Sequence, residues 1–297
     1  MSMNILLTGG SGLVGSKLSK RLIENGHEVR ILTREKNIEH PFYHWDKNKV
    51  DEKAFENLDG IIHLAGATIS KRWTKSYKKE IYESRINTAN LLYTYTEKLA
   101  PNLKFFISAS GSSYYGQITS DTIFKEEDSP GNDFLGKVCI DWENAAYKFK
   151  AFKTRVVCLR TSLVLAKEGG AFDLLKKPIK MCVGANLGDG KQWMPWIHVD
   201  DLVEMYVEAV EQEQMNGSFN AAVPEKINHS TFNKTLARKM DKPFFMPNIP
   251  SALLRIVLGE MSDLILKGSR LSSEKIEKRG FVFKYPTLEK ALDNLLK

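Results

Sequence analysis

The fold is decided close to the amino end, by the stretch NILLTGGSGLVG at residues 4–15. Its first four residues have the apolar character of a short buried strand, and the residues from Leu13 onward have the apolar spacing of a helix. Between the two stand Gly9, Gly12 and Gly15, at GxxGxxG spacing. A strand, a glycine-rich turn and a helix in this order are typical of a unit that binds a dinucleotide.

Glycine suits these positions for physical reasons. Because Gly9 and Gly12 lack side chains, the backbone can turn sharply there and approach a diphosphate, while Gly15 lets the helix pack against the strand. The free N–H groups and the positive end of the helix dipole then favour a bound anion. We therefore expect the turn from Thr8 to Gly15 to hold the pyrophosphate of a dinucleotide cofactor.

The pattern that begins with this turn continues through the first 160 residues. Short apolar runs alternate there with longer segments of helical spacing, as in stacked βαβ units. The predicted strands are Asn4–Leu7, Glu28–Thr33, Gly60–Leu64, Lys104–Ser108 and Arg155–Arg160. The predicted helices are Leu13–Glu24, Ser76–Leu99 and Asp133–Lys150. This order predicts an α/β fold with a doubly wound parallel sheet of the Rossmann type.

The composition changes after about residue 165, where glycines and prolines interrupt the alternation of strand and helix patterns. We predict an NADP-binding Rossmann domain at residues 1–165 and a smaller mixed α+β substrate region at residues 166–297. Within the second region, residues 196–222 are expected to return to the Rossmann sheet. Helical spacing predicts further helices at Ser230–Met240, Ser251–Leu266 and Leu288–Leu296.

The bulk composition fits a globular chain of 297 residues, of which 42% are apolar. The first residues do not resemble a secretory signal, and no apolar run reaches the length of a membrane-spanning helix. The chain has three cysteines, Cys139, Cys158 and Cys182. Because the number is odd, a set of disulfides is not expected, and we expect a cytoplasmic protein. Because the cysteines lack the spacing of metal ligands, no metal site is expected.

The net charge of +7 is spread along the chain. The densest basic run, Lys71–Lys79, contains Trp73 and Tyr77 and has the composition of a weak nucleic-acid patch. No nucleic-acid fold signature accompanies it, so a solvated loop and helix start is the favoured interpretation. Specific binding of nucleic acid is not expected.

The end of the second predicted strand favours one nicotinamide cofactor over the other. A site for NAD usually carries an acid there, which receives the ribose hydroxyls. This chain has Thr33 and Arg34 instead. Because a guanidinium forms paired, charge-assisted hydrogen bonds with a 2′-phosphate, we expect NADP, with NAD less favoured. A surface arginine that binds nothing is the alternative.

Several strings resemble a known family. The first turn and the HLAGAT segment at residues 63–68 resemble the extended short-chain dehydrogenases, which include sugar-nucleotide epimerases and dehydratases. More specific strings resemble a narrower branch of NAD(P)-dependent, epimerase-like proteins of unassigned substrate: KRWT from residue 71, SRINT from 84, DWE from 141, LRTSLVLA from 159 and WIHVDD from 196. The ending GFVFKYPTLEKAL, residues 280–292, resembles that branch's small terminal domain of unassigned role.

The resemblance implies where the cofactor lies. The first turn would contact the pyrophosphate, while Thr33 and Arg34 would contact the ribose phosphate of the adenosine. The remaining contacts would come from the loop after the strand at residues 60–64, from the next helix and from the end of the strand at residues 155–160. The full set is Thr8, Gly9, Gly10, Ser11, Gly12, Leu13, Val14, Gly15, Thr33, Arg34, Leu64, Ala65, Gly66, Arg85, Leu159, Arg160, Thr161 and Ser162. For Arg85, a salt bridge on the helix surface is an equal alternative.

The catalytic positions depart from the family pattern. In the superfamily a tyrosine and a lysine at YxxxK spacing transfer the proton, and the charge of the lysine lowers the pKa of the phenol. Counted back from Glu143, these positions fall on Leu135 and Cys139 here. Neither side chain can transfer a proton in the usual way.

The stretch SASGSSYYG, residues 108–116, is the best remaining source of polar groups. It follows a predicted strand at its carboxyl end, where ligands bind in such sheets. We expect Ser108 and Ser110 to hydrogen-bond a substrate oxygen and take Tyr115 as a candidate acid. A serine-rich turn that only satisfies its own backbone is an equal alternative. In WIHVDD, packing is favoured for His198, and Asp200 with Asp201 is expected to cap the next helix.

Two functions follow as hypotheses. The first is an NADP-dependent oxidoreductase or epimerase-like enzyme that acts on a nucleotide-linked or phosphorylated substrate, with serine hydroxyls and water replacing the usual tyrosine. The second is a cofactor-binding regulatory or scaffold protein that has lost the chemistry, as Leu135 and Cys139 suggest. Relatives in the superfamily often form homodimers through two long helices, so a homodimer is expected.

Overall fold

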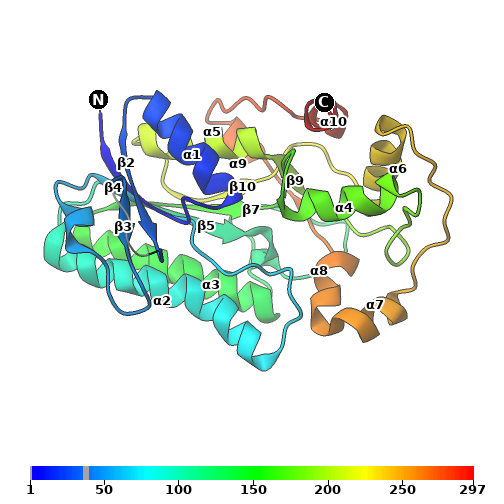
Figure 1. The fold of residues 1–297 in the computed structure, drawn as a ribbon, viewed down its shortest axis with the longest axis horizontal. Helices are drawn as coiled ribbons and strands as arrows, with labels where there is room; N and C mark the ends of the chain where they lie inside the picture. The colour runs from blue at the N-terminus through cyan, green and yellow to red at the C-terminus, as the bar shows by residue number, and fades with distance from the viewer. Residues whose placement is uncertain (1, 36–39) are drawn as a thin grey trace.

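The computed structural model describes residues 2–35 and 40–297, and its centre is a parallel sheet (Figure 1). Seven strands lie in the order β10-β7-β5-β4-β1-β2-β3. They are β1 (Asn4–Thr8), β2 (Glu28–Thr33), β3 (Phe42–His44), β4 (Gly60–His63), β5 (Phe105–Gly111), β7 (Arg155–Thr161) and β10 (Gly217–Ala221). The chain order reverses between β1 and β4. In sheets of this kind ligands bind outside the carboxyl ends of the strands at such a reversal, and this region is called the crevice. The predicted doubly wound sheet is confirmed.

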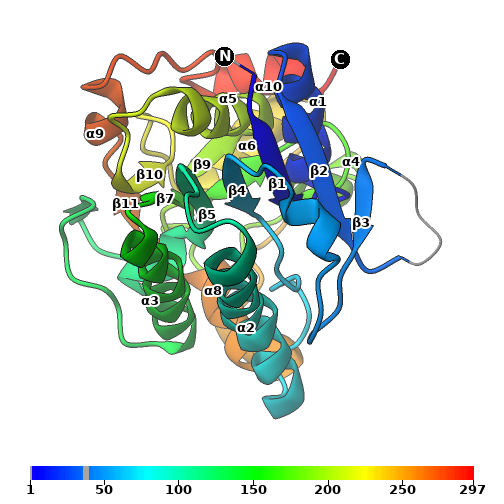
Figure 2. The same cartoon turned by 90° about the vertical axis from the view of Figure 1, so that its left-hand side faces the viewer.

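Helices cover both faces of the sheet (Figures 1 and 2). α1 (Leu13–Glu24) and α5 (Val199–Glu211) lie on one face, and α2 (Lys75–Leu99) and α3 (Phe134–Tyr147) lie on the other. Alternate residues of each strand therefore enter different cores: Ile5 and Leu7 pack on the α1 side, and Leu6 packs on the α2 side. Burial on both faces explains why the strands are apolar runs without alternation.

Further short elements lie outside the seven-stranded sheet. Two strand pairs lie outside the sheet, β6 (Ile123–Phe124) with β11 (Arg270–Leu271) and β8 (Leu163–Leu165) with β9 (Trp196–His198). The short 3-10 helices are η1 (Glu52–Phe55), η2 (Ser112–Tyr115) and η3 (Lys148–Phe152). No helix of the described residues is long and apolar enough to span a bilayer.

The carboxyl-terminal half is largely helical, with α4 (Gly170–Lys180), α6 (His229–Lys239), α9 (Glu274–Glu277) and α10 (Leu288–Leu295). The predicted single helix Ser251–Leu266 is wrong. The structure has α7 (Ser251–Leu258), η4 (Gly259–Ser262) and α8 (Asp263–Leu266) there. Gly259 has a φ of +62°, a backbone conformation that ends a helix and favours glycine.

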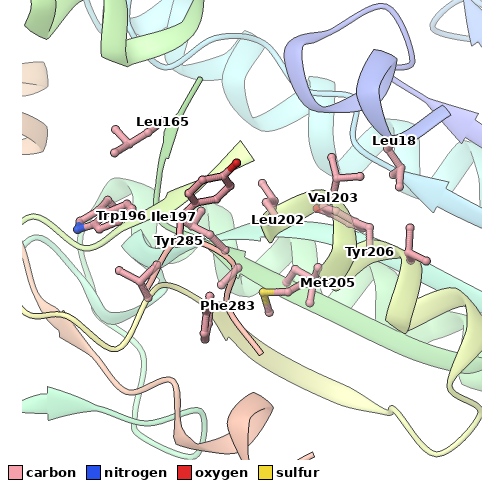
Figure 3. Packing of buried hydrophobic residues seen from close by; sticks show 14 of the residues in the cluster. Leu18, Leu165, Trp196, Ile197, Leu202, Val203, Met205, Tyr206, Phe283 and Tyr285 are labelled. Carbon is pink, nitrogen blue, oxygen red and sulfur yellow. The ribbon is translucent and has the colours of Figure 1, made fainter. Parts of the chain in front are cut away.

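The carboxyl-terminal segment shares its core with the Rossmann sheet (Figure 3). Phe283 and Tyr285 pack in one cluster with Trp196 of β9 and with Met205 and Tyr206 of α5. All five side chains are buried. The last part of the chain is therefore held by hydrophobic contact with the helix that covers the sheet.

Two acidic residues at the start of α5 do not act as predicted. The expectation that Asp200 and Asp201 cap this helix is wrong, because His198 is the N-cap and its Nδ1 accepts from the Asp200 backbone N–H at 3.1 Å. The buried Asp201 carboxylate instead accepts from the N–H groups of Lys284 and Tyr285, at 2.8 and 3.0 Å. Asp201 therefore fixes the carboxyl-terminal segment against α5.

Replacing Asp201 with alanine is expected to lower the free energy of unfolding by about 3 kcal/mol, because two N–H groups lose a charged, buried acceptor. The neighbouring Asp200→Ala is the matched control. Its partly exposed carboxylate lies 3.6 Å from Lys17 Nζ and 3.7 Å from the His198 ring and accepts no hydrogen bond within the described residues, so a loss below about 1 kcal/mol is expected. Urea unfolding of both variants measures the difference, and equal losses would contradict the assigned role of Asp201.

Candidate functional site

The glycine turn between β1 and α1 closes tightly on itself and on the loop after β4. The Gly12 N–H donates to the Gly9 carbonyl at 3.0 Å, and Gly9 has a φ of +73°. A β-carbon added at Gly15 would lie 2.2 Å from the Gly9 oxygen, and one added at Gly9 would lie 3.0 Å from the carbonyl carbon of Leu64. Side chains at these positions would therefore push the turn open.

The start of α1 has the features of an anion site. Gly12 is the N-cap, and no side chain caps the helix. Its first N–H groups are consequently left to water or to a ligand. Gly170, at the start of α4, approaches the same turn, since a β-carbon there would lie 3.0 Å from the Leu13 side chain. α4 therefore begins beside the first turn.

A buried network at the carboxyl ends of β1 and β4 shapes the neighbouring loop. The Thr8 hydroxyl accepts from the N–H groups of Leu64 and Ala65, both at 3.1 Å, and lies 2.8 Å from Nδ1 of His63. His63 Nε2 lies 3.2 Å from the Arg85 carbonyl, which can only accept, so Nε2 carries the proton. Nδ1 then accepts from the Thr8 hydroxyl.

His63 is neutral in this network. Burial lowers the pKa of His63 to about 4, because a charged imidazole would lose its solvation there. The ring joins β1, β4 and α2 at the edge of the crevice. The sequence analysis missed this positioning role, although His63 begins the HLAGAT segment and follows an apolar strand.

Arg85, on α2, lies directly behind the loop that follows β4. Its guanidinium donates to the Ala67 and Ile81 carbonyls, both at 3.0 Å, and its Cζ lies 5.0 Å from the centre of the Trp142 ring. A β-carbon added at Gly66 would lie 2.9 Å from the same Cζ. Among residues 2–35 and 40–297, Arg85 has no carboxylate partner, so the alternative of a surface salt bridge is not observed.

The two positions at which the family pattern has its proton-transferring pair are buried in α3. Leu135 and Cys139 are 4% and 5% exposed. Burial raises the pKa of Cys139 to about 12, so the thiol stays protonated at neutral pH. Its sulfur would lie 3.4 Å from a β-carbon added at Gly111, at the end of β5. No base is present at either position.

The hydroxyls of Ser108, Ser110 and Tyr115 all form internal hydrogen bonds. Ser108 donates to the Ala109 carbonyl at 2.8 Å, and Ser110 donates to Glu143 at 2.8 Å. Tyr115 is 1% exposed, and burial raises the pKa of its phenol. These contacts favour structural roles for the three hydroxyls over contact with a substrate.

A buried ion pair binds the hydroxyls of Ser110 and Tyr115 on the α3 side of the sheet. Arg160 donates to both carboxylate oxygens of Glu143, at 2.8 and 2.9 Å. The same guanidinium donates to the Tyr115 hydroxyl at 2.9 Å, and Glu143 accepts from Ser218 at 2.8 Å. Arg160 was predicted as a cofactor contact, but its side chain forms hydrogen bonds with Glu143 instead. A pocket of about 310 Å³ adjoins this pair, lined also by Tyr114 and Lys275.

The other predicted contacts lie along the carboxyl edge of the sheet. Thr33 ends β2, and the next residue, Arg34, is exposed. At the end of β7, Thr161 lies beside Gly111 of β5, and Ser162 donates to the Ala221 carbonyl at 2.7 Å. The structure therefore places the predicted segments at one edge, in the order of the strands that carry them.

The basic run at Lys71–Lys79 is engaged with other parts of the chain. Lys78 pairs with Glu260, and the Trp73 indole donates to the Ile69 carbonyl at 3.0 Å. The Trp73 ring also packs against Phe134, with the ring centres 5.5 Å apart. The Trp73 side chain is therefore used for internal packing.

Comparison with known proteins agrees with this architecture. Residues 5–222 match the NAD dependent epimerase/dehydratase family, and residues 249–295 match a domain of unknown function, DUF1731. An epimerase family protein of Staphylococcus aureus strain N315 is 36% identical over 296 residues, which cover 98% of each chain. The resemblance inferred from the motifs is confirmed.

Two solved structures extend the similarity. A human epimerase family protein, crystallised with NADPH, is 27% identical, with a TM-score of 0.89 over 99% of each chain. A nucleoside-diphosphate sugar epimerase from Corynebacterium glutamicum is 29% identical, with a TM-score of 0.83. The second match covers all of this chain and 58% of the other.

His63→Gln tests the buried network, because glutamine keeps an N–H donor but does not titrate. A folded-state pKa lowered from 6.5 to about 4 stabilises the fold above pH 6.5, and this contribution is lost as the pH falls toward 4. Between pH 7 and pH 5 the native protein should lose about 2 kcal/mol through His63. The variant should be less stable than the native protein at pH 7, and the difference should shrink by about that amount at pH 5. Urea unfolding at both pH values measures the free energy of unfolding of the two proteins. If the difference between them is the same at pH 7 and pH 5, His63 does not titrate as assigned.

Proposed function

The chain belongs to the NAD dependent epimerase/dehydratase family, and we propose that it binds NADP at the glycine turn and acts as an oxidoreductase or epimerase-like enzyme. The observation that carries this proposal is the uncapped start of α1 behind three closely packed glycines. Open N–H groups at a helix start, with no side chains in front of them, suit a diphosphate.

The order of the strands supports a direction for the cofactor. Arg34 follows β2, the first turn follows β1, and Gly66 lies in the loop after β4. Since β4, β1 and β2 are neighbours in the sheet, adenosine would lie over β2, the pyrophosphate over β1 and the nicotinamide half over β4 and β5. When bound, NADP would supply hydride transfer at the nicotinamide carbon.

Backbone and small side chains would line the rest of this path. The loop after β4 contributes Leu64 and Ala65, whose N–H groups are already held by Thr8. The end of β7 contributes Thr161 and Ser162, whereas Leu159, also predicted as a contact, is fully buried in the core cluster shared with α5. Small or apolar groups at these places leave room for a flat ring at the carboxyl ends of β5 and β7.

The preference for NADP over NAD rests on Arg34. It is exposed at the end of β2, and no hydrogen bond or ion pair with the rest of residues 2–35 and 40–297 holds its side chain. A guanidinium at this place suits a 2′-phosphate. The human relative, which was crystallised with NADPH, supports the same choice.

The substrate we propose is nucleotide-linked or otherwise phosphorylated. The Corynebacterium neighbour is named a nucleoside-diphosphate sugar epimerase, which supports this class. Of the serines in the turn after β5, Ser112 makes no side-chain hydrogen bond within the described part of the chain. Ser112 is therefore the hydroxyl left to orient a substrate oxygen, with water as the proton carrier in place of tyrosine.

The second candidate function is a cofactor-binding regulatory or scaffold protein. It is favoured by the buried Leu135 and Cys139 and by the internal hydrogen bonds of Ser108, Ser110 and Tyr115. Such a protein would change a partner contact or its homodimeric state when NADPH binds. The two functions share the cofactor site and differ in turnover and in the response of the assembly to NADPH.

NADPH titration followed by a turnover screen separates the two functions. Calorimetry should show binding of NADPH. Turnover should appear either as net oxidation of NADPH with one of a series of carbonyl compounds or as conversion of a nucleotide sugar to its epimer, which leaves the cofactor unchanged overall. Tight binding with no turnover, together with a change in oligomeric state, would favour the regulatory function. Failure of both NADPH and NADH to bind the folded protein would remove both proposals.

Arg34→Ala is expected to weaken NADPH binding about 10- to 100-fold, because charge-assisted hydrogen bonds to the 2′-phosphate are lost. NADH lacks that phosphate, so its dissociation constant should be unchanged and serves as the internal control. Calorimetric titration of both cofactors checks the prediction. Equal affinities of the native protein for NADPH and NADH would remove the role assigned to Arg34.

A further inference from the structure

Helix α7 is apolar, but the protein does not bury it. Six of its eight residues are apolar, and none of the eight is buried. Leu253, Ile256 and Val257 share one side of the helix, called the α7 face, and are 52%, 75% and 58% exposed. Every other described helix of at least eight residues buries two residues or more. An exposed apolar face of this kind marks a surface that a ligand or a partner covers.

The rest of the chain holds α7 at both ends. Before the helix, the Ile249 N–H donates to the Asn186 carbonyl at 2.8 Å. After the helix, Glu260 forms an ion pair with Lys78 of α2, and Leu264 packs against the apolar cluster between α2 and α3. The helix therefore has no free end with which it could fold its apolar face onto the rest of the chain.

The carboxyl end of α7 lies beside the loop that follows β4. A β-carbon added at Gly259, the residue after α7, would lie 3.9 Å from Nε of Arg72. Figure 1 shows α7 and α8 on the side of the sheet toward which β5 points, and the crevice lies at this carboxyl edge. The loop at residues 64–74 thus connects the predicted cofactor path, at Gly66, with the end of α7, at Arg72.

Two exposed cations of this loop have no acidic partner. Lys71 and Arg72 form no ion pair within residues 2–35 and 40–297, whereas Lys78 and Lys79 of the same basic run are paired. The Trp73 ring packs against the start of α3 and holds the loop in place. Positive charge is therefore fixed at one end of an apolar face. This arrangement is complementary to a molecule with an anionic group at one end and an apolar chain at the other.

We propose that the substrate is a phosphorylated amphiphile, whose phosphate lies at Lys71 and Arg72 and whose apolar chain lies along the α7 face. The inference rests on the proposed enzyme function and narrows its substrate class. A phosphate accepts charge-assisted hydrogen bonds from both cations, and the chain removes the α7 face from water. An eight-residue helix is about 12 Å long, which is the length scale of a medium-length alkyl chain.

Calorimetric titration with monodecyl phosphate, used as a monomer, tests this assignment. It should bind with or without saturating NADPH, and at least about 10-fold more tightly than ethyl phosphate or decyltrimethylammonium, which lack the chain or the negative charge. Arg72→Gln and Ile256→Ser should each weaken its binding about 10-fold, because they remove a charge and an apolar contact. The NADPH dissociation constant of both variants should stay within about twofold of the native value.

Arg279→Gln and Ile23→Ser are the matched controls, since both residues are exposed and lie on other elements, after α9 and in α1. Their binding of monodecyl phosphate should equal that of the native protein. Melting temperatures without ligand show whether each variant folds, and Leu253→Ser replaces Ile256→Ser if the latter does not.

Three results would overturn the proposal. The first is no binding of monodecyl phosphate to the native protein, or equal binding by the α7, loop and control variants. The second is a native dimer that Ile256→Ser dissociates, since a second copy of the chain would then cover the α7 face. The third is binding to phosphatidylglycerol vesicles that Ile256→Ser abolishes, with no binding of the monomeric probe. Failure of NADPH to bind while monodecyl phosphate still binds would instead refute the proposed NADP site.

Discussion

The close contact between the first turn and the loop after β4 is the constraint on which the site depends. Gly9 approaches the Leu64 carbonyl carbon so closely that a β-carbon would lie 3.0 Å from it, and Thr8 accepts two N–H groups of the same loop. Because the strand order reverses here, this contact forms the floor of the crevice. It also sets the path of residues 64–67, behind which Arg85 lies.

Three ionisable groups near the crevice are buried or partly buried, and two of them avoid an uncompensated charge, each in its own way. His63 stays neutral, since burial lowers its pKa to about 4. Arg160 is paired with Glu143 through two hydrogen bonds, which also explains why Ser110 and Tyr115 are drawn inward. Within the described residues Arg85 is neither neutral nor paired with a carboxylate. This distinguishes Arg85, a candidate ligand contact, from Arg160, whose role is structural.

The second half of the chain supports the site from outside the sheet. Asp201 and the aromatic side chains of Phe283 and Tyr285 fix the carboxyl-terminal segment on α5, while α4 begins beside Leu13. The carboxyl-terminal region is thus built into the core that carries the glycine turn. Its docking stabilises the same helices that frame the crevice.

Local sequence determined five of the seven strands, the glycine turn and the positions of α1, α2 and α3. The short β3 was not predicted, and β10 was expected only within the returning segment 196–222. The predicted features depend on apolar spacing and on backbone freedom, both of which act over a few neighbouring residues. The same holds for Arg34, because a residue that directly follows a strand end stays at the edge of the sheet. The family resemblance likewise rested on short strings of residues.

Only the tertiary structure decided which polar groups face the crevice and which form hydrogen bonds with other groups inside the protein. Ser110 and Tyr115 turn to a carboxylate and a guanidinium that are distant in sequence, His198 rather than Asp201 caps α5, and Gly259 ends α7 early. A side chain takes its partner from segments that meet only after folding, since hydrogen bonds and desolvation depend on distance in space and not along the chain.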